Sequence, residues 1–164
     1  MKVLVADDDA SVRESLRKVL EEADYEVVLA TDGQEALARF EEANVDLLLL
    51  DVGMPIKSGW DAFERISNQN PLLPIIVITG QPDQYDTALA AGVGALMEKP
   101  LDVPRLLETM TELLAERKEA RLRRLCGYNR DTRRVPSSTA LFFQQLRERY
   151  STPLAGIPLD KLRD

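Results

Sequence analysis

Apolar residues in the first two thirds of the chain fall into five short runs, each followed by a segment with helical spacing. The runs cover residues 2–6, 26–31, 45–50, 74–79 and 95–98. Strand-like runs that alternate with amphipathic helices predict a parallel sheet covered by helices on both faces. Residues 47–50 are all leucine, which predicts a central strand buried on both sides. We therefore expect an α/β protein with a doubly wound, five-stranded parallel sheet.

Helical spacing predicts five helices that connect and follow these strands. The apolar faces of the first, second, third and fifth contain Val12, Leu16, Val19 and Leu20; Ala36, Leu37 and Phe40; Trp60, Phe63 and Ile66; and Leu106, Leu107, Met110, Leu113 and Leu114. Asp9 or Ser11 is expected to cap the first helix. The fourth helix, around residues 87–91, is short and rich in Ala and Gly, so we expect it to move easily. The fifth is predicted to continue toward Gly127 and to project from the domain.

The C-terminal segment differs from the preceding sequence in charge. Residues 1–114 contain 9 basic and 22 acidic residues, whereas residues 115–164 contain 12 basic and 6 acidic ones. This shift predicts a domain at residues 1–118 and a basic, partly helical extension at residues 119–164. Residues 130–134 are predicted to form a loop, and Leu141, Phe142, Leu146 and Tyr150 a short amphipathic helix that docks on protein. The extension has no recognisable DNA-binding domain.

Composition excludes several classes of site. The chain has no histidine and one cysteine, Cys126, which excludes an internal disulfide, the usual zinc sites and histidine-based catalysis. No run approaches the roughly 18 apolar residues of a membrane span, and the N-terminus lacks the order of a secretory signal. We therefore expect a cytoplasmic protein that does not bind membranes, in which carboxylates supply the chemistry.

Charged and hydroxyl side chains stand where the predicted strands end. Asp7 and Asp8 follow the first run, Asp51 follows the third, Thr79 ends the fourth and Lys99 follows the fifth. The carboxyl ends of parallel strands meet at one edge of a sheet, so these groups should converge. Three converging acids repel one another unless a cation neutralises them, and oxygen ligands suit Mg²⁺. An ammonium and a hydroxyl could contact the oxygens of a phosphoryl group.

Four segments resemble the signature of the CheY-like receiver domain of two-component response regulators. They are residues 5–9 (VADDD), 50–55 (LDVGMP, followed by Gly59), 78–80 (ITG) and 98–100 (EKP). The resemblance covers about residues 1–114. It implies a flavodoxin-like sheet with strand order 2-1-3-4-5 and a cis peptide bond between Lys99 and Pro100.

The resemblance also assigns roles to individual residues. It implies that Asp51 is the phosphoacceptor, that Thr79 is the switch hydroxyl and that Lys99 contacts the phosphate. The Mg²⁺ ligands would be Asp8, Asp51 and the backbone carbonyl of Gly53, with Asp7 bound either directly or through water. The sequence departs from the family at Leu96, where Tyr or Phe is common. The aromatic part of the usual switch is therefore missing.

By the same resemblance, a histidine kinase or phosphotransfer protein passes phosphate to Asp51. Phosphorylation would then bias the face built from the fourth helix, fifth strand and fifth helix toward a downstream protein target or toward a homodimer. Such a protein assists its own phosphorylation and dephosphorylation but is not a stand-alone enzyme.

Three alternatives to this interpretation involve other classes of protein. The chain could be a constitutive adaptor that uses the fold only as a scaffold. It could bind nucleic acid through the arginines of its extension, which are Arg121, Arg123, Arg124, Arg130, Arg133 and Arg134. We favour this interpretation less than docking on protein. It could be a phosphoaspartate hydrolase of similar topology. The hydrolase is disfavoured because no cap domain is evident and Gly53 stands where a second catalytic acid would be needed.

Overall fold

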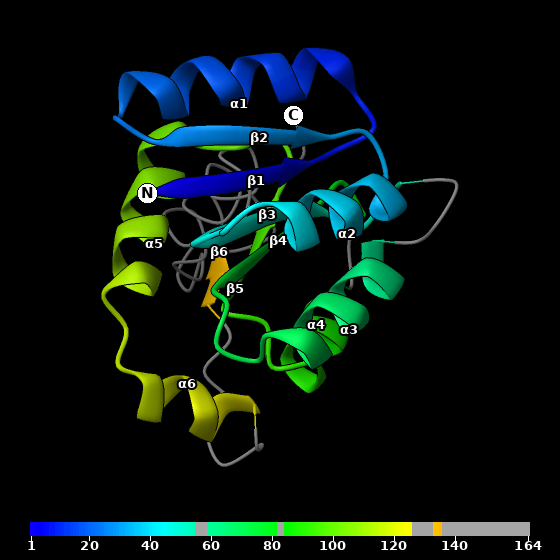
Figure 1. Ribbon diagram of the computed structural model, residues 1–164. Coiled ribbons are helices and arrows are strands. Elements are labelled where there is room, and N and C mark those ends of the chain that lie inside the picture. Colours follow the sequence, from blue (N-terminus) through cyan, green and yellow to red (C-terminus); the bar gives the residue numbers. More distant parts are fainter. Residues whose placement is uncertain (55–58, 82–83, 126–132, 136–164) are drawn as a thin grey trace, which may run out of the picture.

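The computed structural model of the chain describes residues 1–54, 59–81, 84–125 and 133–135. In chain order, the elements are β1 (Lys2–Ala6), α1 (Ala10–Glu22), β2 (Glu26–Ala30), α2 (Gly33–Glu42), β3 (Leu47–Asp51), α3 (Gly59–Gln69), β4 (Ile75–Thr79), α4 (Tyr85–Ala90), β5 (Ala95–Glu98), α5 (Val103–Leu114), α6 (Lys118–Leu125) and β6 (Arg133–Val135). Figure 1 shows the strands stacked between the helices. The five predicted strands and five predicted helices are all present.

The strands form one parallel sheet in the order β2-β1-β3-β4-β5-β6. The first five strands follow the predicted order 2-1-3-4-5, and the CheY-like α/β fold is confirmed. The sixth strand was not predicted, since residues 130–134 were expected to form a loop; for Arg133 and Arg134 that expectation was wrong. Strand propensity here is weak, with one apolar residue in three, and pairing with β5 decides the conformation.

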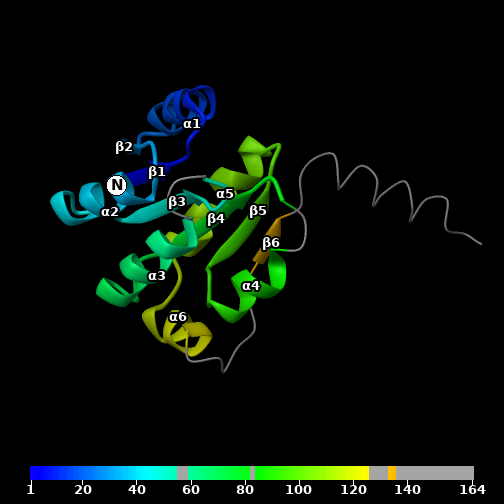
Figure 2. The same cartoon turned by 90° about the vertical axis from the view of Figure 1, so that its right-hand side faces the viewer.

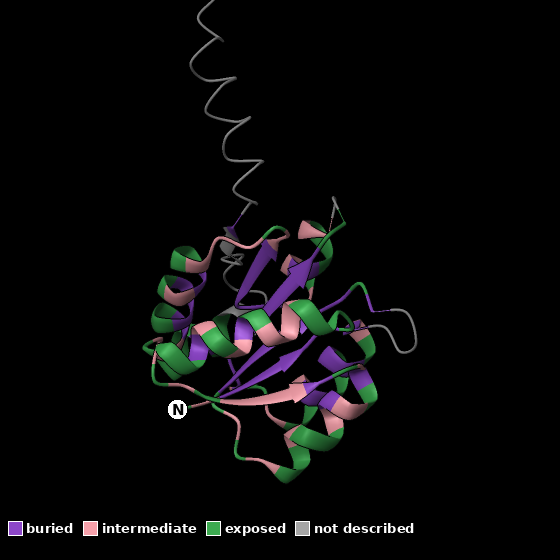
Figure 3. Ribbon diagram, turned by 90° about the horizontal axis from the view of Figure 1, so that it is seen from above, coloured by how far each residue is buried: buried purple, intermediate pink, exposed green. Residues whose placement is uncertain are grey.

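Helices cover both faces of the sheet and divide the core into two parts. One set of buried side chains packs with α2, α3 and α4, and the other packs with α1 and α5. Figure 3 shows the strands, buried except for the partly exposed β2, between helices whose outer faces are exposed. Every residue of β3 and β4 is buried, so the prediction of a central strand at the leucine run is confirmed.

Acidic caps fix the starts of three helices at the carboxyl edge of the sheet. The Asp9 carboxylate accepts hydrogen bonds from the backbone N–H groups of Ser11 at 2.7 Å and Val12 at 3.4 Å, which lower the pKa of Asp9. Asp32 caps α2 and Asp102 caps α5 in the same way. These caps hold in place the loops that carry the candidate site.

The chain turns back toward the domain after α5, so the prediction of a continuous projecting helix was wrong. The fifth helix ends at Leu114, and α6 begins at Lys118. From α6 the Arg121 side chain reaches the domain, where its guanidinium donates to the backbone carbonyl of Leu113 at 2.6 Å and to that of Leu72. The last carbonyls of a helix need external partners, and Arg121 supplies one. This use of Arg121 removes it from the arginines proposed for nucleic acid.

The structure leaves parts of the extension outside the described residues. The predicted amphipathic helix with Leu141, Phe142, Leu146 and Tyr150 lies there. The boundary at residue 118 stays a prediction. Within the described ranges, every helix is too short or too polar to cross a bilayer.

Candidate functional site

The candidate residues lie where four neighbouring strands end. Asp7 follows β1, Asp51 is the last residue of β3 and Thr79 is the last residue of β4. The register of the sheet aligns these ends, because Ala6 pairs with Leu50 and Asp51 with Ile78. Lys99 follows β5 and donates its backbone N–H to the Thr79 carbonyl at 2.8 Å. Parallel pairing alone therefore brings together groups that are far apart in the sequence.

The Lys99 ammonium connects the two buried carboxylates. Its Nζ lies 2.8 Å from Asp7 Oδ2 and 2.6 Å from Asp51 Oδ2. Asp7 is 1% exposed and Asp51 is 4% exposed, whereas the Lys99 side chain keeps 27% of its surface in solvent. The Lys99–Pro100 peptide bond that follows is cis, as predicted. The ammonium thus neutralises two acids that water reaches poorly.

Burial and charge pairing shift the pKa values at this site. Burial raises the pKa of Asp7, although the hydrogen bond from Lys99 opposes the shift. Burial of Lys99 acts against its charge, but the hydrogen bonds to Asp51 and Asp7 outweigh burial and raise the pKa of the ammonium. Lys99 is therefore a fixed positive charge at neutral pH.

Asp8 joins the two buried acids to form a candidate metal site. One carboxylate oxygen from each of Asp7, Asp8 and Asp51 lies within 4.8 Å of the others, and Asp8 is exposed. Three carboxylates that face solvent on one side are a donor set that fits a hard divalent cation. Gly53 contacts the site through its N–H, which donates to Asp51 Oδ1 at 2.6 Å. The predicted roles of these residues, including that of the Gly53 carbonyl, stay predictions.

Comparison with known proteins agrees with this geometry. Residues 3–111 match the response regulator receiver domain. The chain belongs to the response regulator receiver family. It therefore contains a receiver domain of the two-component type, and the resemblance inferred from the four segments is confirmed.

Several curated response regulators are similar to this receiver. The alkaline phosphatase synthesis transcriptional regulatory protein PhoP of Bacillus subtilis is 33% identical over 120 residues, which are 72% of this chain and 50% of PhoP. Response regulator MprA of Mycobacterium avium is 38% identical over 120 residues, which are 72% of this chain and 53% of MprA. The matched part of the receiver thus spans about half the length of these relatives.

Solved receiver structures share its fold. The receiver domain protein of Methanospirillum hungatei is 31% identical with a TM-score of 0.67, covering 73% of this chain and 96% of that chain. Response regulator TrrA of Thermotoga maritima, solved in complex with Mg²⁺ and BeF, is 30% identical with a TM-score of 0.64, covering 68% of this chain and 97% of that chain.

The Thr79 hydroxyl of this receiver is tied to the loop after β4. Thr79 is 1% exposed; its Oγ1 accepts a hydrogen bond from the Gln81 N–H at 3.0 Å and lies 3.3 Å from the Gln81 carbonyl, to which it donates. Leu96, at the position where the family often has an aromatic residue, is 1% exposed and packs in the core beneath α2, α3 and α4. A buried leucine cannot act as a rotating surface aromatic, so any switch here needs other contacts.

Two contacts near the site were not found from the sequence. The Trp60 indole N–H at the start of α3 donates to the Gln84 side-chain oxygen beside α4 at 3.2 Å. Arg13 of α1 donates to the Asp7 backbone carbonyl at 2.6 Å. Helical spacing marked Trp60 as a core residue, and nothing in the sequence indicated that its N–H would reach Gln84. This contact joins α3 to the loop that leads into α4.

A groove beside Lys99 offers an apolar surface next to the acidic cluster. It runs between α1 and the segment that joins β5 to α5. Its lining consists of Ser11, Val12, Ser15, Leu16, Val19, Lys99, Pro100, Leu101 and Val103. An apolar groove that ends at a charged site is suited to dock a protein whose reactive group must reach that site.

Gly59 permits a close approach between α3 and the acceptor strand. A Cβ atom at this position would lie 2.6 Å from Val52 Cα and 3.0 Å from the Asp51 carbonyl carbon, which backbone atoms cannot accommodate without moving. We expect Gly59→Ala to lower the free energy of unfolding by about 2–3 kcal/mol, measured by urea denaturation.

Gly80 provides the matched control for this prediction. A Cβ atom at Gly80 has no neighbour within 4 Å, so Gly80→Ala should change the free energy of unfolding by less than about 1 kcal/mol. Equal effects of the two substitutions would contradict the close-approach role of Gly59.

Proposed function

We propose that this receiver accepts a phosphoryl group on Asp51 with the help of Mg²⁺, and that phosphorylation switches its contacts with other proteins. The observation that carries the proposal is the Lys99 ammonium, which lies within hydrogen-bond distance of both Asp7 and Asp51. Asp8 completes the acidic cluster at the exposed side. The protein would act as a signalling switch and not as a stand-alone enzyme.

The chain's own residues can prepare Asp51 for attack on phosphorus. The Gly53 N–H holds Oδ1, and Oδ2 lies against the Lys99 ammonium. We expect one carboxylate oxygen to form the new bond to phosphorus while the bond between phosphorus and the donor nitrogen breaks, leaving the electron pair on nitrogen. Lys99 would then contact a phosphoryl oxygen, because the negative charge that attracts its ammonium would lie on the phosphoryl group and no longer on the Asp51 carboxylate.

Asp7, Asp8 and Asp51 would hold Mg²⁺, and the Gly53 carbonyl is the proposed fourth protein ligand. When bound, the ion supplies neutralisation of the acceptor carboxylate and of the phosphoryl oxygens. The oxygen donor set and the complex of the similar regulator TrrA with Mg²⁺ and BeF support this assignment.

The donor phosphohistidine must lie outside these 164 residues, since they contain no histidine. We propose a histidine kinase or phosphotransfer protein that docks on the groove between α1 and the start of α5. Lys99 lines this groove and also contacts Asp51, so a partner seated there would present its phosphohistidine beside the acceptor. Transfer of phosphate from such a protein to Asp51 would also distinguish a phosphorylation switch from a constitutive adaptor, which would accept none.

Thr79 would carry the signal away from Asp51. A hydroxyl donor attracted by the phosphoryl charge would leave the Gln81 backbone, to which Thr79 is now bonded. The loop after β4 would then be released from Thr79, while Gln84 still contacts Trp60. Because Trp60 is the only tryptophan, its fluorescence should report this rearrangement.

The direct test is phosphate incorporation into the full chain from radiolabelled acetyl phosphate. We expect label in the presence of Mg²⁺ and none when a chelator removes the ion. Trp60 fluorescence should change with the same Mg²⁺ dependence. Label that is independent of Mg²⁺, or no label from either acetyl phosphate or a purified histidine kinase, would contradict the proposal.

Gly53 should shorten the life of the phosphorylated state. The residue has no side chain to cover Asp51, so water can approach the acyl phosphate. We expect Gly53→Arg to lengthen the phosphate half-life several-fold, because the long side chain would shield the phosphoryl group and pair with its charge. The measurement is loss of label after removal of the donor, and Asp24→Asn, a substitution at an exposed residue between α1 and β2, is the control. An unchanged half-life would contradict the role of Gly53.

A further inference from the structure

The outer edge of β5 is covered by a segment from the basic extension. Strand β6 pairs with β5 in parallel, with Arg133 opposite Ala95, Arg134 opposite Leu96 and Val135 opposite Met97. The Val135 side chain is 7% exposed and packs in the core part formed with α1 and α5. The chain thus occupies with its own residues a strand edge that would otherwise present unpaired backbone groups. Figure 2 shows β6 beside β5.

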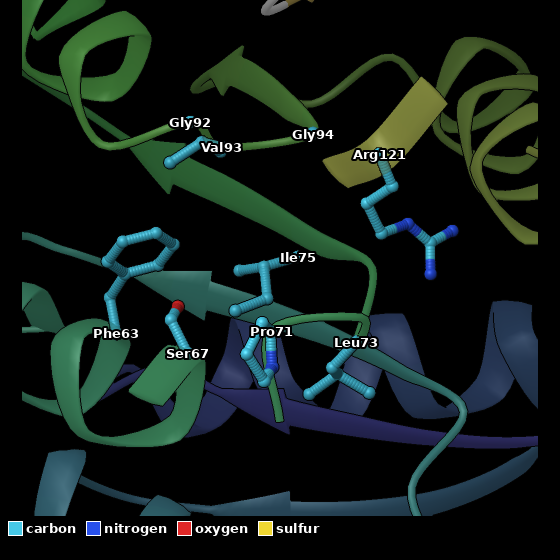
Figure 4. A pocket seen from close by; sticks show the side chains of 9 residues that line it. All are labelled: Phe63, Ser67, Pro71, Leu73, Ile75, Gly92, Val93, Gly94 and Arg121. Atoms are coloured by element: carbon cyan, nitrogen blue, oxygen red, sulfur yellow. The ribbon is translucent and has the colours of Figure 1, made fainter. Parts of the chain in front are cut away.

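Helix α6 brings the chain to the place where β6 can begin. A strand parallel to β5 must start at the amino edge of the sheet, and α5 ends at that edge. Arg121 holds α6 there with hydrogen bonds to the carbonyls of Leu72 and Leu113 and to the Glu116 carboxylate at 3.3 Å. Figure 4 shows its side chain extending beside the pocket lined by Leu73 and Ile75. Arg121 is itself 7% exposed, so this anchor is well packed.

The strand itself is held less firmly than its anchor. It has three residues, and the one side chain of the strand that the structure describes, Val135, is buried. Ordering a backbone segment has a conformational cost for every residue, and one apolar side chain offsets little of it. A strand of three residues is therefore a weaker attachment to the domain than the helix that Arg121 anchors.

The end of β6 is close to the acceptor site along the sheet. Val135 pairs with Met97, two residues before Lys99, and Glu98 pairs with Thr79. A movement of Thr79 and Lys99 toward a phosphoryl group would thus act on the part of β5 that holds β6. The contact between β5 and β6 is placed to respond to the state of Asp51.

We propose that β6 is a displaceable internal occupant of the β5 edge, which keeps the surface formed by α4, β5 and α5 closed until Asp51 is phosphorylated. Release by phosphorylation rests on the proposed function; occupancy of the edge does not. Displacement exposes a row of backbone N–H and C=O groups, the type of surface to which an extended protein segment adds as a strand. A homodimer through this face would need β6 to leave or to take part.

The test is hydrogen exchange measured by mass spectrometry on the full chain, followed in peptides that contain β5. In a strand, N–H groups point alternately to the two neighbours, so loss of β6 exposes some β5 amides and leaves those paired with β4. We expect β5 amides to exchange at least several-fold faster in Val135→Asp than in the wild type, because a carboxylate is costly in the apolar core. Val135→Ile is the matched control and should behave like the wild type.

The same measurement with Mg²⁺ and beryllofluoride tests release. We expect faster exchange in both β5 and residues 133–135 when the phosphate mimic is bound. If β5 amides exchange equally fast in the wild type and in Val135→Asp, and β4 peptides are still protected, then β6 does not cover the β5 edge. If Trp60 fluorescence shows that the mimic has bound but β5 exchange is unchanged, then phosphorylation does not release β6.

These outcomes separate this proposal from the proposed function. If the mimic does not bind and Asp51 takes no label, phosphoacceptor activity fails and release fails with it. The comparison of Val135→Asp with Val135→Ile still decides whether β6 covers β5, since it requires no phosphate. Protection of β4 amides serves as the control for folding in every variant.

Discussion

Replacement of Asp51 by Asn is expected to abolish phosphate incorporation. A carboxamide has the shape of the carboxylate but lacks the charge and the nucleophilic oxygen, so the bond to phosphorus cannot form. We expect label from acetyl phosphate to fall below about 1% of the wild-type level. The Asn carbonyl oxygen can still accept the hydrogen bond from the Gly53 N–H, whereas the amide NH2 cannot accept the bond that Lys99 donates to Asp51 Oδ2 in the wild type. Lys99 keeps its ion pair with Asp7. Folding should therefore persist.

Asp24→Asn is the control for this substitution. Asp24 is exposed, lies in the turn between α1 and β2 and has a φ of 62°, a conformation that Asn tolerates well. This variant should take up label like the wild type. Full labelling of Asp51→Asn would show that phosphate is attached at another residue and would contradict the assignment of the acceptor.

The parallel sheet and the convergence of the site residues were predictable from a simple pattern, whereas the strand order was implied by the family resemblance. Each apolar run is long enough to identify a strand, and parallel strands place their carboxyl ends at one edge. Asp7, Asp51 and Thr79 follow or end such runs, so their convergence could be inferred before any distance was known. The acidic cap at Asp9 was equally evident, since an aspartate before an amphipathic stretch favours a helix start.

The features that escaped prediction depend on tertiary contacts. Strand β6 has one apolar residue and forms because the edge of β5 is open to it. The end of α5 at Leu114 was obscured because the sequence beyond it also favours a helix; Arg121 instead bonds to backbone carbonyls that no sequence pattern reveals. The hydrogen bond between Trp60 and Gln84 escaped for the same reason.

Replacement of Lys99 by Met should destabilise the protein and at the same time strengthen its binding of Mg²⁺. The wild-type ammonium neutralises Asp7 and Asp51, which are both buried. Removing one partner leaves acids that repel each other in a poorly solvated site. Because Lys99 is partly exposed, we expect a loss of about 2 kcal/mol in the free energy of unfolding without Mg²⁺, below the range for fully buried pairs. Urea denaturation in chelator measures this loss.

Mg²⁺ should reverse the loss, because the ion would supply the charge that Lys99 no longer provides. The ammonium also repels a cation placed among the same carboxylates, so its removal should tighten Mg²⁺ binding by about tenfold. Titration followed by Trp60 fluorescence measures the affinity. Lys18→Met is the control. Lys18 is exposed on α1 and lies 4.0 Å from the Glu14 carboxylate, so neither stability nor affinity should change appreciably. Weaker Mg²⁺ binding in Lys99→Met would contradict this account, since it would mean that the lysine supports the metal site instead of competing with the ion for its carboxylates.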